Sequence, residues 1–396
     1  MAPRGPFAIA VRMAALVLTL PACGDEPTAS GPPGALVLTV AGGGHNVPDR
    51  YSTDLWIHGG YAYTGTSGAS RRAGKPGDVV KIWRLDPRGA PVLADSVRER
   101  NVVTVSDVQV SEDGELLLFS AEGGVDEGLF LYGLTDPEHP VKLGHVPVAG
   151  GVHTATLADI NGRRYAFAAR NPPVAQLAVY DITTPATARL VASVPVAPKY
   201  GVHDTFVRDG LAFVFAWNSG VLILDVGNGV RGGTPSQPVE VGGVVPSANG
   251  VPGGPASHNG WWFHNRASGE RRYLFVGQEG PMVVGSRTSG DIHVIDVSDL
   301  AAPREVAFFH LDGAGTHNFW MDERRQILYA AYYNEGVVAL DVSGELEGDL
   351  SDRLIGRIRP GGDTDTFTWG VMLAGGSLYA SDMLSGLWQL TVGEAP

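Results

Sequence analysis

Short apolar runs separated by polar turns recur along almost the whole chain. A typical unit contains the run Leu211–Phe215, a loop of small residues, and the run Val221–Leu224, which ends in Asp225. Apolar runs of this length, bounded by Gly, Asn, Asp and Pro, predict β-strands. Equivalent runs end in Asp86, Asp181, Asp296 and Asp341. Each aspartate is expected to accept hydrogen bonds from backbone amides two residues on, in an Asx turn.

This pattern repeats with a period of about 45–50 residues, apart from one unit that carries an insertion. A period of that size with four strands per unit predicts a β-propeller. Seven units fit, and they start near Thr53, Ser106, His153, His203, His258, His317 and Thr368. The last unit has only three strands, and the unassigned N-terminal run Ala35–Val40 is expected to supply the fourth. The predicted fold is therefore all-β, a seven-bladed propeller of four-stranded antiparallel blades over residues 35–392, closed by its N-terminal strand.

The third strands carry a resemblance to a known family. The segments VLILDV (Val221–Val226), IHVIDV (Ile292–Val297), LAVYDI (Leu177–Ile182) and VVALDV (Val337–Val342) resemble the LVIVD repeat of bacterial secreted and lipid-anchored β-propellers. The resemblance covers nearly all of the chain after its N-terminal segment. It implies the propeller fold but no particular reaction, because members of that family mostly lack an assigned activity.

The N-terminus has the pattern of a targeting segment. Arg4 and Arg12 precede the short apolar stretch Ala14–Leu20. The segment Leu20–Cys23 that follows resembles a bacterial lipobox. We expect residues 1–22 to be a lipoprotein signal peptide and residues 23–34 to be a flexible tether from a lipidated Cys23. The alternative is an ordinary signal peptide followed by an incidental cysteine. The expected location is the cell envelope, anchored by lipid to a membrane, with the periplasmic or surface face of the outer membrane favoured by Gly24.

Composition and charge narrow the functional classes. Hydrophobic residues make up 44% of the chain and charged residues 18%, which is too apolar for a disordered protein. The formal net charge is −13, so the chain would repel a phosphate backbone, and nucleic acid is not an expected partner. A monomer is expected.

Four histidines occupy the same position in successive repeats. His153, His203, His258 and His317 start the innermost strands of units three to six, and each is followed by a polar residue. Those neighbours are Thr154, Asp204, Asn259 and Asn318, while Thr53-Asp54, Ser106-Asp107 and Trp369 occupy the position in the other units. One interpretation is that these side chains brace neighbouring blades. The other is that three or four imidazoles bind a divalent transition metal in the central channel, since imidazole suits Zn, Cu, Fe or Ni.

A second set of polar and aromatic residues is predicted at the same mouth of the channel. In a meander, the start of the first strand and the end of the second lie at one face. The loops there are expected to form a face for a ligand or partner, with Glu122, Arg170, Trp217, Asn218, Glu279, Tyr332, Asn334 and Asp382. The insertion between Gln278 and Asp291 caps the channel there, meets a partner or is a neutral loop. Trp56, Trp83, Trp261, Trp262 and Trp320 lie in strand patterns and are expected to pack between blades.

These observations favour a non-catalytic role. The leading hypothesis is a binding or interaction scaffold that presents the channel mouth to an unknown protein or small-molecule ligand. The alternative is a metal-dependent enzyme, a hydrolase or an oxidoreductase, with the histidine column as its metal ligands. No catalytic residue is assigned from the sequence.

Overall fold

The computed structural model describes residues 34–395, except 69–73, 88, 172–173, 197–200, 250 and 252–253. The predicted signal peptide, the predicted lipidation site Cys23 and nearly all of the predicted tether lie outside these residues. Within the described ranges, no helix is long and apolar enough to cross a bilayer. Two short 3-10 helices, Pro185–Thr187 and Ser351–Arg353, lie in the described ranges.

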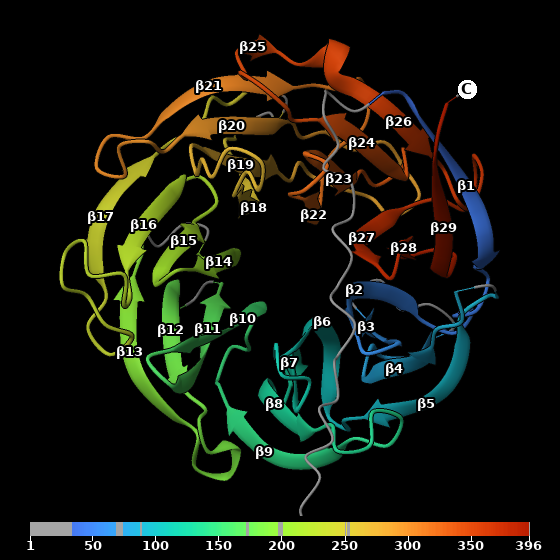
Figure 1. Ribbon diagram of the computed structural model, residues 1–396. Coiled ribbons are helices and arrows are strands. Elements are labelled where there is room, and N and C mark those ends of the chain that lie inside the picture. Colours follow the sequence, from blue (N-terminus) through green and yellow to red (C-terminus); the bar gives the residue numbers. More distant parts are fainter. Residues whose placement is uncertain are drawn as a thin grey trace, which may run out of the picture.

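Seven antiparallel sheets are arranged as blades around a central channel (Figure 1). The first strand of each blade lines the channel, and the fourth forms the outer rim. The first blade contains β2 (Tyr51–His58), β3 (Tyr61–Ser67), β4 (Val79–Arg84) and β5 (Val92–Arg98), and the second contains β6 (Val102–Val110), β7 (Leu116–Gly124), β8 (Gly128–Gly133) and β9 (Val141–Pro147). The third blade contains β10 (Thr154–Ile160), β11 (Arg163–Arg170), β12 (Gln176–Asp181) and β13 (Arg189–Pro195). The fourth contains β14 (Asp204–Arg208), β15 (Leu211–Phe215), β16 (Val221–Asp225) and β17 (Val239–Val244).

The fifth blade carries one strand more than the repeat predicts. It contains β18 (Ser257–Trp262), β19 (Tyr273–Gln278), β20 (Ile292–Asp296), β21 (Arg304–Phe309) and the two-residue strand β25 (Gly348–Asp349). β25 comes from the loop of the sixth blade and pairs in parallel with β21, with Ala307 opposite Gly348. The sixth blade is β22 (Phe319–Asp322), β23 (Ile327–Ala331), β24 (Val337–Asp341) and β26 (Leu354–Ile358).

The seventh blade joins the two ends of the chain. It contains β27 (Thr368–Ala374), β28 (Ser377–Asp382), β29 (Gly386–Glu394) and, as its outer strand, β1 (Leu36–Gly43). β1 runs antiparallel to β29, with Leu36 opposite Glu394 and Gly43 opposite Trp388. The predicted closure is confirmed, and so is the predicted seven-bladed fold.

The core is divided among the interfaces between blades. Because successive strand residues point to opposite faces, one strand serves two interfaces. In β7, Leu117 and Phe119 pack toward the first blade, whereas Leu116 and Leu118 pack toward the third. Each pair of neighbouring blades shares one such apolar cluster. This explains why the second and third strands read as nearly continuous apolar runs.

The repeated aspartates have the structural role that the sequence predicts. Asp181, Asp296 and Asp341 each accept a hydrogen bond from the backbone amide two residues on, at 3.2, 3.0 and 2.8 Å. Asp225 accepts from several amides of the turn that follows, including those of Gly227 and Arg231. These carboxylates therefore hold the turns between the third and fourth strands.

Candidate functional site

The four histidines of the column occupy equivalent backbone positions. The amides of His153, His203 and His317 donate to the carbonyls of Ala169, Phe215 and Ala331, each at the end of its blade's second strand. Their rings form a continuous arc: centroids are 4.1 Å apart for His153 and His203, 4.4 Å for His203 and His258, and 4.2 Å for His258 and His317. Trp369 continues the arc, 4.1 Å from His317. The fold thus brings together four residues that are far apart in the sequence.

The two outer histidines of this arc have partners within the protein. The Nδ1 atom of His153 lies 3.0 Å from Oε2 of Glu122. Burial disfavours the imidazolium form of His153, but the Glu122 carboxylate more than offsets this and raises the pKa of His153 to about 9. Nδ1 of His317 lies 2.7 Å from the carbonyl oxygen of Trp369 and donates to it. Burial, with the nearby charge of His258, lowers the pKa of His317 well below its ordinary value, so this ring is neutral.

The two middle histidines face a carboxylate instead. Nε2 of His203 and Nε2 of His258 lie 3.5 and 3.6 Å from Oε2 of Glu279. Burial and neighbouring histidine charges lower the pKa of His203 well below its ordinary value, and burial lowers that of His258 to about 3. Burial raises the pKa of Glu279, opposed by a hydrogen bond from the Tyr333 hydroxyl to Oε1. Two neutral imidazoles and a buried carboxyl group therefore converge on one point.

The loops that support this point have unusual backbone geometry. Trp217 and Tyr333 follow the second strands of the fourth and sixth blades, and both have positive φ angles, 52° and 37°. A bulky side chain rarely adopts this region, and such outliers cluster at functional sites. The Trp217 ring stacks on His203, with centroids 4.6 Å apart and an interplanar angle of 24°. Both strained residues thus contact a member of the His203–His258–Glu279 group.

The insertion of the fifth blade covers this end of the channel. Met282 and Val284 pack against a small buried cluster of Tyr333, Phe367 and Met383, contributed by the sixth and seventh blades. Val283, between them, is 71% exposed. Of the three interpretations of the Gln278–Asp291 insertion, these contacts favour the cap.

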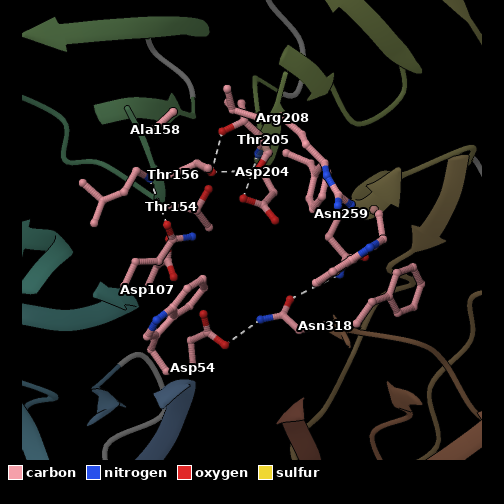
Figure 2. Close-up of a pocket in the computed structure, with 18 of the residues that line it drawn as sticks. Asp54, Asp107, Thr154, Thr156, Ala158, Asp204, Thr205, Arg208, Asn259 and Asn318 are labelled. Carbon is pink, nitrogen blue, oxygen red and sulfur yellow. Dashed lines mark hydrogen bonds between the residues drawn. The ribbon is translucent and has the colours of Figure 1, made fainter. Parts of the chain in front are cut away.

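Below the histidines, a cavity of about 680 Å³ occupies the channel. The residues after the column positions project into it, and Figure 2 shows Asp54, Asp107, Asp204, Asn259 and Asn318 around the central space. Nδ2 of Asn318 donates to Oδ1 of Asp54 at 2.7 Å. Burial and the facing Asp107 raise the pKa of Asp54 well above its ordinary value, and burial, together with Asp107, raises that of Asp204 to about 7. The channel therefore holds several buried carboxyl groups close to one another, and the His153 ring acts on two of them, Asp107 and Asp204.

Two residues further along the inner strands, aromatic rings line the same cavity. Phe206, Trp261, Trp320 and Trp56 follow one another around the wall, with neighbouring ring centroids 5.1, 5.2 and 6.5 Å apart. The prediction that the strand tryptophans pack between blades is correct for Trp83 and Trp262, which are 1% and 5% exposed. Trp56, Trp261 and Trp320 also pack against interface clusters, as predicted, but each is only partly buried and lines the cavity as well. Their position was readable from the sequence, because each lies two residues after the polar residue that follows a column position, and strand side chains alternate.

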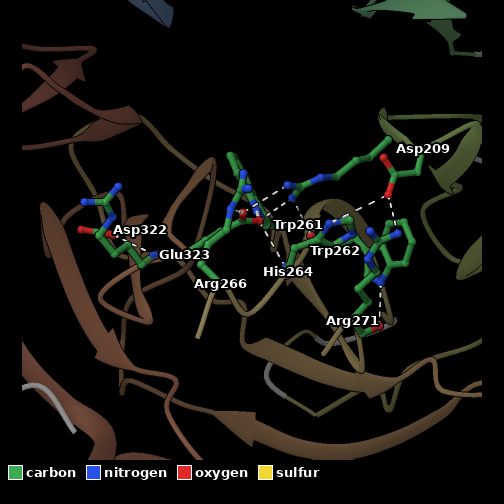
Figure 3. Close-up of polar contacts among 10 residues, drawn as sticks. Asp209, Trp261, Trp262, His264, Arg266, Arg271, Asp322 and Glu323 are labelled. Atoms are coloured by element: carbon green, nitrogen blue, oxygen red, sulfur yellow. Dashed lines mark hydrogen bonds and ion pairs between the residues drawn. The ribbon is translucent and has the colours of Figure 1, made fainter. Parts of the chain in front are cut away.

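The far end of the cavity reaches exposed turn residues, among them Glu112, Asn161 and Asp209. The cavity therefore opens at the face opposite the histidines. An ion-pair network joins three blades there (Figure 3): Glu323 accepts from Arg208 at 3.1 Å and from Arg266 at 3.1 Å. Burial opposes ionisation of Glu323, but the Arg208 guanidinium more than offsets it and lowers the pKa. Arg208 is thus neutralised within the protein.

The remaining residues of the predicted ligand face hold loops in place. Arg170 donates to the carbonyl of Ala149, and Oδ1 of Asn218 accepts from the amide of Ala256. The Tyr332 hydroxyl donates a hydrogen bond to the carbonyl of Gly290, and Nδ2 of Asn334 donates one to the carbonyl of Gly313. The Asp382 carboxylate accepts hydrogen bonds from the backbone amides of Phe367 and Ser385. Tyr332 and Asp382 are fully buried. Of the predicted face, Glu122, Trp217 and Glu279 contact the histidine arc directly.

Comparisons with solved structures agree with this architecture. The β-propeller domain of Myceliophteria thermophila Cps50 (Swd1) is similar with a TM-score of 0.56 and 14% identity, over 88% of this chain and 98% of that one. This domain is a β-propeller as well. The C-terminal WD40 domain of Sif2 is similar with a TM-score of 0.53 and 12% identity, over 86% of this chain and 81% of that one. At these identities the likeness shows the fold alone. No family model and no curated protein matches the chain, so the resemblance to the LVIVD repeat is not confirmed.

Proposed function

We propose that this propeller is a binding protein whose central channel takes a small organic cation, such as an alkylammonium group. The observation that carries the proposal is the convergence of Asp54, Asp107 and Asp204 on one cavity, directly above a belt of aromatic rings. A carboxylate near the centre of a partly desolvated channel attracts a cation more strongly than one on the surface.

The charge balance of the wall supports a cationic ligand. Acidic residues outnumber basic ones along it: Asp54, Asp107, Glu112, Asp159, Asp204 and Asp209 stand against Arg164, Arg208 and the His153 imidazole, whose pKa is raised to about 9. Both arginines are paired within the protein. Arg208 binds Glu323, and Arg164 binds Asp113 and Asp159 at 2.7 Å each. The arginines therefore leave Asp54, Asp107 and Asp204 available to a ligand, whereas Asp159 is paired with Arg164 and Asp209 with Arg271.

The aromatic belt supports an organic cation rather than a bare ion. Trp56, Trp261 and Trp320 are only partly buried and line the cavity. The faces of tryptophan rings attract ammonium and guanidinium groups, and they also cover the alkyl part of such a ligand. A volume of about 680 Å³ lies within the range of small-molecule sites.

A calorimetric titration tests this proposal. Spermidine and tetramethylammonium are the cationic probes, and acetate and glucose are the anionic and neutral ones. We expect binding of the cations alone, weakened by salt. Asp54→Asn and Asp107→Asn should each weaken spermidine binding about 3–10-fold, and Trp261→Ala should weaken tetramethylammonium binding by a similar factor. Asp352→Asn, an exposed charge on the outer rim, is the matched control and should bind as the parent does.

Two results would overturn the proposal. One is binding of glucose with no binding of either cation, which would indicate a carbohydrate site on the same rings. The other is equal loss of affinity in Asp352→Asn and Asp54→Asn, which would indicate a general charge effect. A metal-dependent hydrolase or oxidoreductase remains the alternative function, and it requires substrate turnover that depends on an ion at the histidines.

We also propose that Cys23 attaches the propeller to an envelope membrane through lipid. The support is the lipobox-like Leu20–Cys23 and the polar segment that separates it from β1. In bacterial cells, Cys23→Ser should abolish detergent-phase partitioning of the mature protein. A variant that still partitions as the parent does would exclude the anchor.

A further inference from the structure

The histidine arc contains one place where three potential metal ligands face one another. Nε2 of His203, Nε2 of His258 and Oε2 of Glu279 belong to a group whose ligand atoms all lie within 4.8 Å of one another. The two distances to Oε2, 3.5 and 3.6 Å, exceed those of ordinary hydrogen bonds to nitrogen. They match the separation of about 3.4 Å between ligand atoms in a tetrahedral zinc site.

We infer that His203, His258 and Glu279 bind a divalent transition ion, with Zn²⁺ the best fit, at the closed end of the channel. Two imidazoles and one carboxylate form a donor set suited to zinc. The ion would compensate the charge of Glu279, a carboxylate that is only 7% exposed.

The surroundings distinguish these three residues from the rest of the arc. His153 is paired with Glu122, and Nδ1 of His317 is paired with the carbonyl of Trp369. Neither belongs to the three-residue group. Tyr333 donates to Oε1 of Glu279, which orients the other oxygen toward the histidines. The cap over Tyr333 shields the site from solvent at that end.

The site also touches the cavity, because His258 lines it. A bound ion would therefore lie at the inner end of the space proposed for the organic cation. The two proposals do not depend on each other: Glu279 is not among the cavity residues, whereas Asp54 and Asp107 are. Glu279→Gln should abolish metal binding and retain spermidine binding, so the failure of one proposal is distinguishable from the failure of the other.

The test uses the whole propeller after dialysis against a chelator. Titration with Co²⁺ should give the visible absorption of a tetrahedral site at one ion per chain, and Zn²⁺ should displace the Co²⁺. His203→Ala, His258→Ala and Glu279→Gln should remove this signal. Tyr333→Phe should weaken Zn²⁺ binding about 10–100-fold, as expected for a residue that orients a ligand. Because Glu279→Gln and Tyr333→Phe keep the side-chain shape, these two variants still test the metal site even if an alanine variant fails to fold.

Two matched controls separate this site from other histidines. His153→Gln removes a neighbouring ring of the same arc, and His310→Gln removes a histidine that is 44% exposed. Both should retain the full Co²⁺ signal. The inference is overturned if the parent takes up no more ion than the His203→Ala/His258→Ala double variant. It is also overturned if His310→Gln, rather than Glu279→Gln, abolishes uptake, because the ion would then be adventitious.

Discussion

The interfaces between blades and the wall of the central channel are built from the same repeats, yet they differ in character. Every interface contains one apolar cluster, and residues such as Phe275 and Val338 are fully buried there. Along the channel, equivalent positions hold different chemistry: Thr53, Ser106, His153 and His258 occupy one column. The repeat therefore keeps the pattern that stabilises each blade and varies the residues that face the common space.

Unpaired buried polar atoms gather near the histidine end of the channel, although the hydroxyl of Tyr329, at an interface, is also one of them. Within the described residues, buried side-chain atoms without a hydrogen-bond partner include Oγ of Ser52, Nδ1 of His203, Nδ1 of His258 and Oδ1 of Asn259. An unpaired buried polar atom destabilises the folded state by about 1–3 kcal/mol. Departures of this kind from the rules of stable packing are expected at functional sites. The comparison predicts that stability depends on the interfaces and binding on the channel.

The largest effect should come from opening the ring. A chain that begins at Gly44 lacks β1, which exposes the edge of β29 and removes the buried side chains of Leu36 and Leu38. We expect the free energy of unfolding to fall by on the order of 5 kcal/mol, with aggregation on heating. Calorimetry against a chain that begins at Gly34 measures the effect. Equal melting of the two chains would show that closure does not stabilise the ring.

A pair of aromatic substitutions separates the two regions directly. Phe275 is fully buried at an interface, and Phe275→Ala should lower the free energy of unfolding by about 3–5 kcal/mol. Trp261 lines the cavity, and Trp261→Phe should lower the free energy of unfolding by less than about 1 kcal/mol. The same substitution should weaken the binding of organic cations. Chemical denaturation and titration calorimetry check both values. A channel substitution that destabilises as much as the interface substitution would contradict the division.

A smaller effect is expected at the ion pair of His153 and Glu122. The pKa of His153 is raised to about 9, so the folded state binds the proton more tightly than the unfolded state does. The pair therefore stabilises the fold fully at pH values below the ordinary histidine pKa, and this contribution is lost as the pH rises through about 9. In metal-free protein, Glu122→Gln should lower the free energy of unfolding by ~1–2 kcal/mol near pH 6, and much less near pH 10. NMR titration of His153 should show its pKa falling in the variant. An unchanged pKa would mean that Glu122 is not the partner.

The smallest effect, and one of opposite sign, is expected at Asp54. Burial and Asp107 raise its pKa, so the folded state binds the proton more tightly than the unfolded state does. Stability therefore declines as pH rises above about 4. Asp54→Asn keeps the oxygen that accepts from Asn318, and it should be more stable than the parent by on the order of 1 kcal/mol near pH 8. The difference in the free energy of unfolding should vanish below pH ~4. Chemical denaturation of both proteins between pH ~4 and pH ~8 measures it, and equal stability near pH ~8 would contradict the prediction.

Much of the fold was predictable because it depends on local pattern. The apolar runs, the turn aspartates and the period led to seven blades, and the spare strand Ala35–Val40 led to closure by β1. The alignment of His153, His203, His258 and His317 in one column was predictable as well. The parallel strand β25 was not, since a two-residue pairing of Gly348 and Asp349 with another blade leaves no periodic signal.

By itself, the sequence determined the number of blades, the order of strands and the set of residues at the histidine end, because these follow from periodicity and strand alternation. Only the tertiary structure decided how the histidines divide among partners. Glu122, Glu279 and the carbonyl of Trp369 reach them from different loops, and side-chain direction at a blade end is set by packing rather than by repeat position. The tertiary structure also decided which end of the channel is closed, because Met282 and Val284 reach across to residues of other blades that no local pattern links to them.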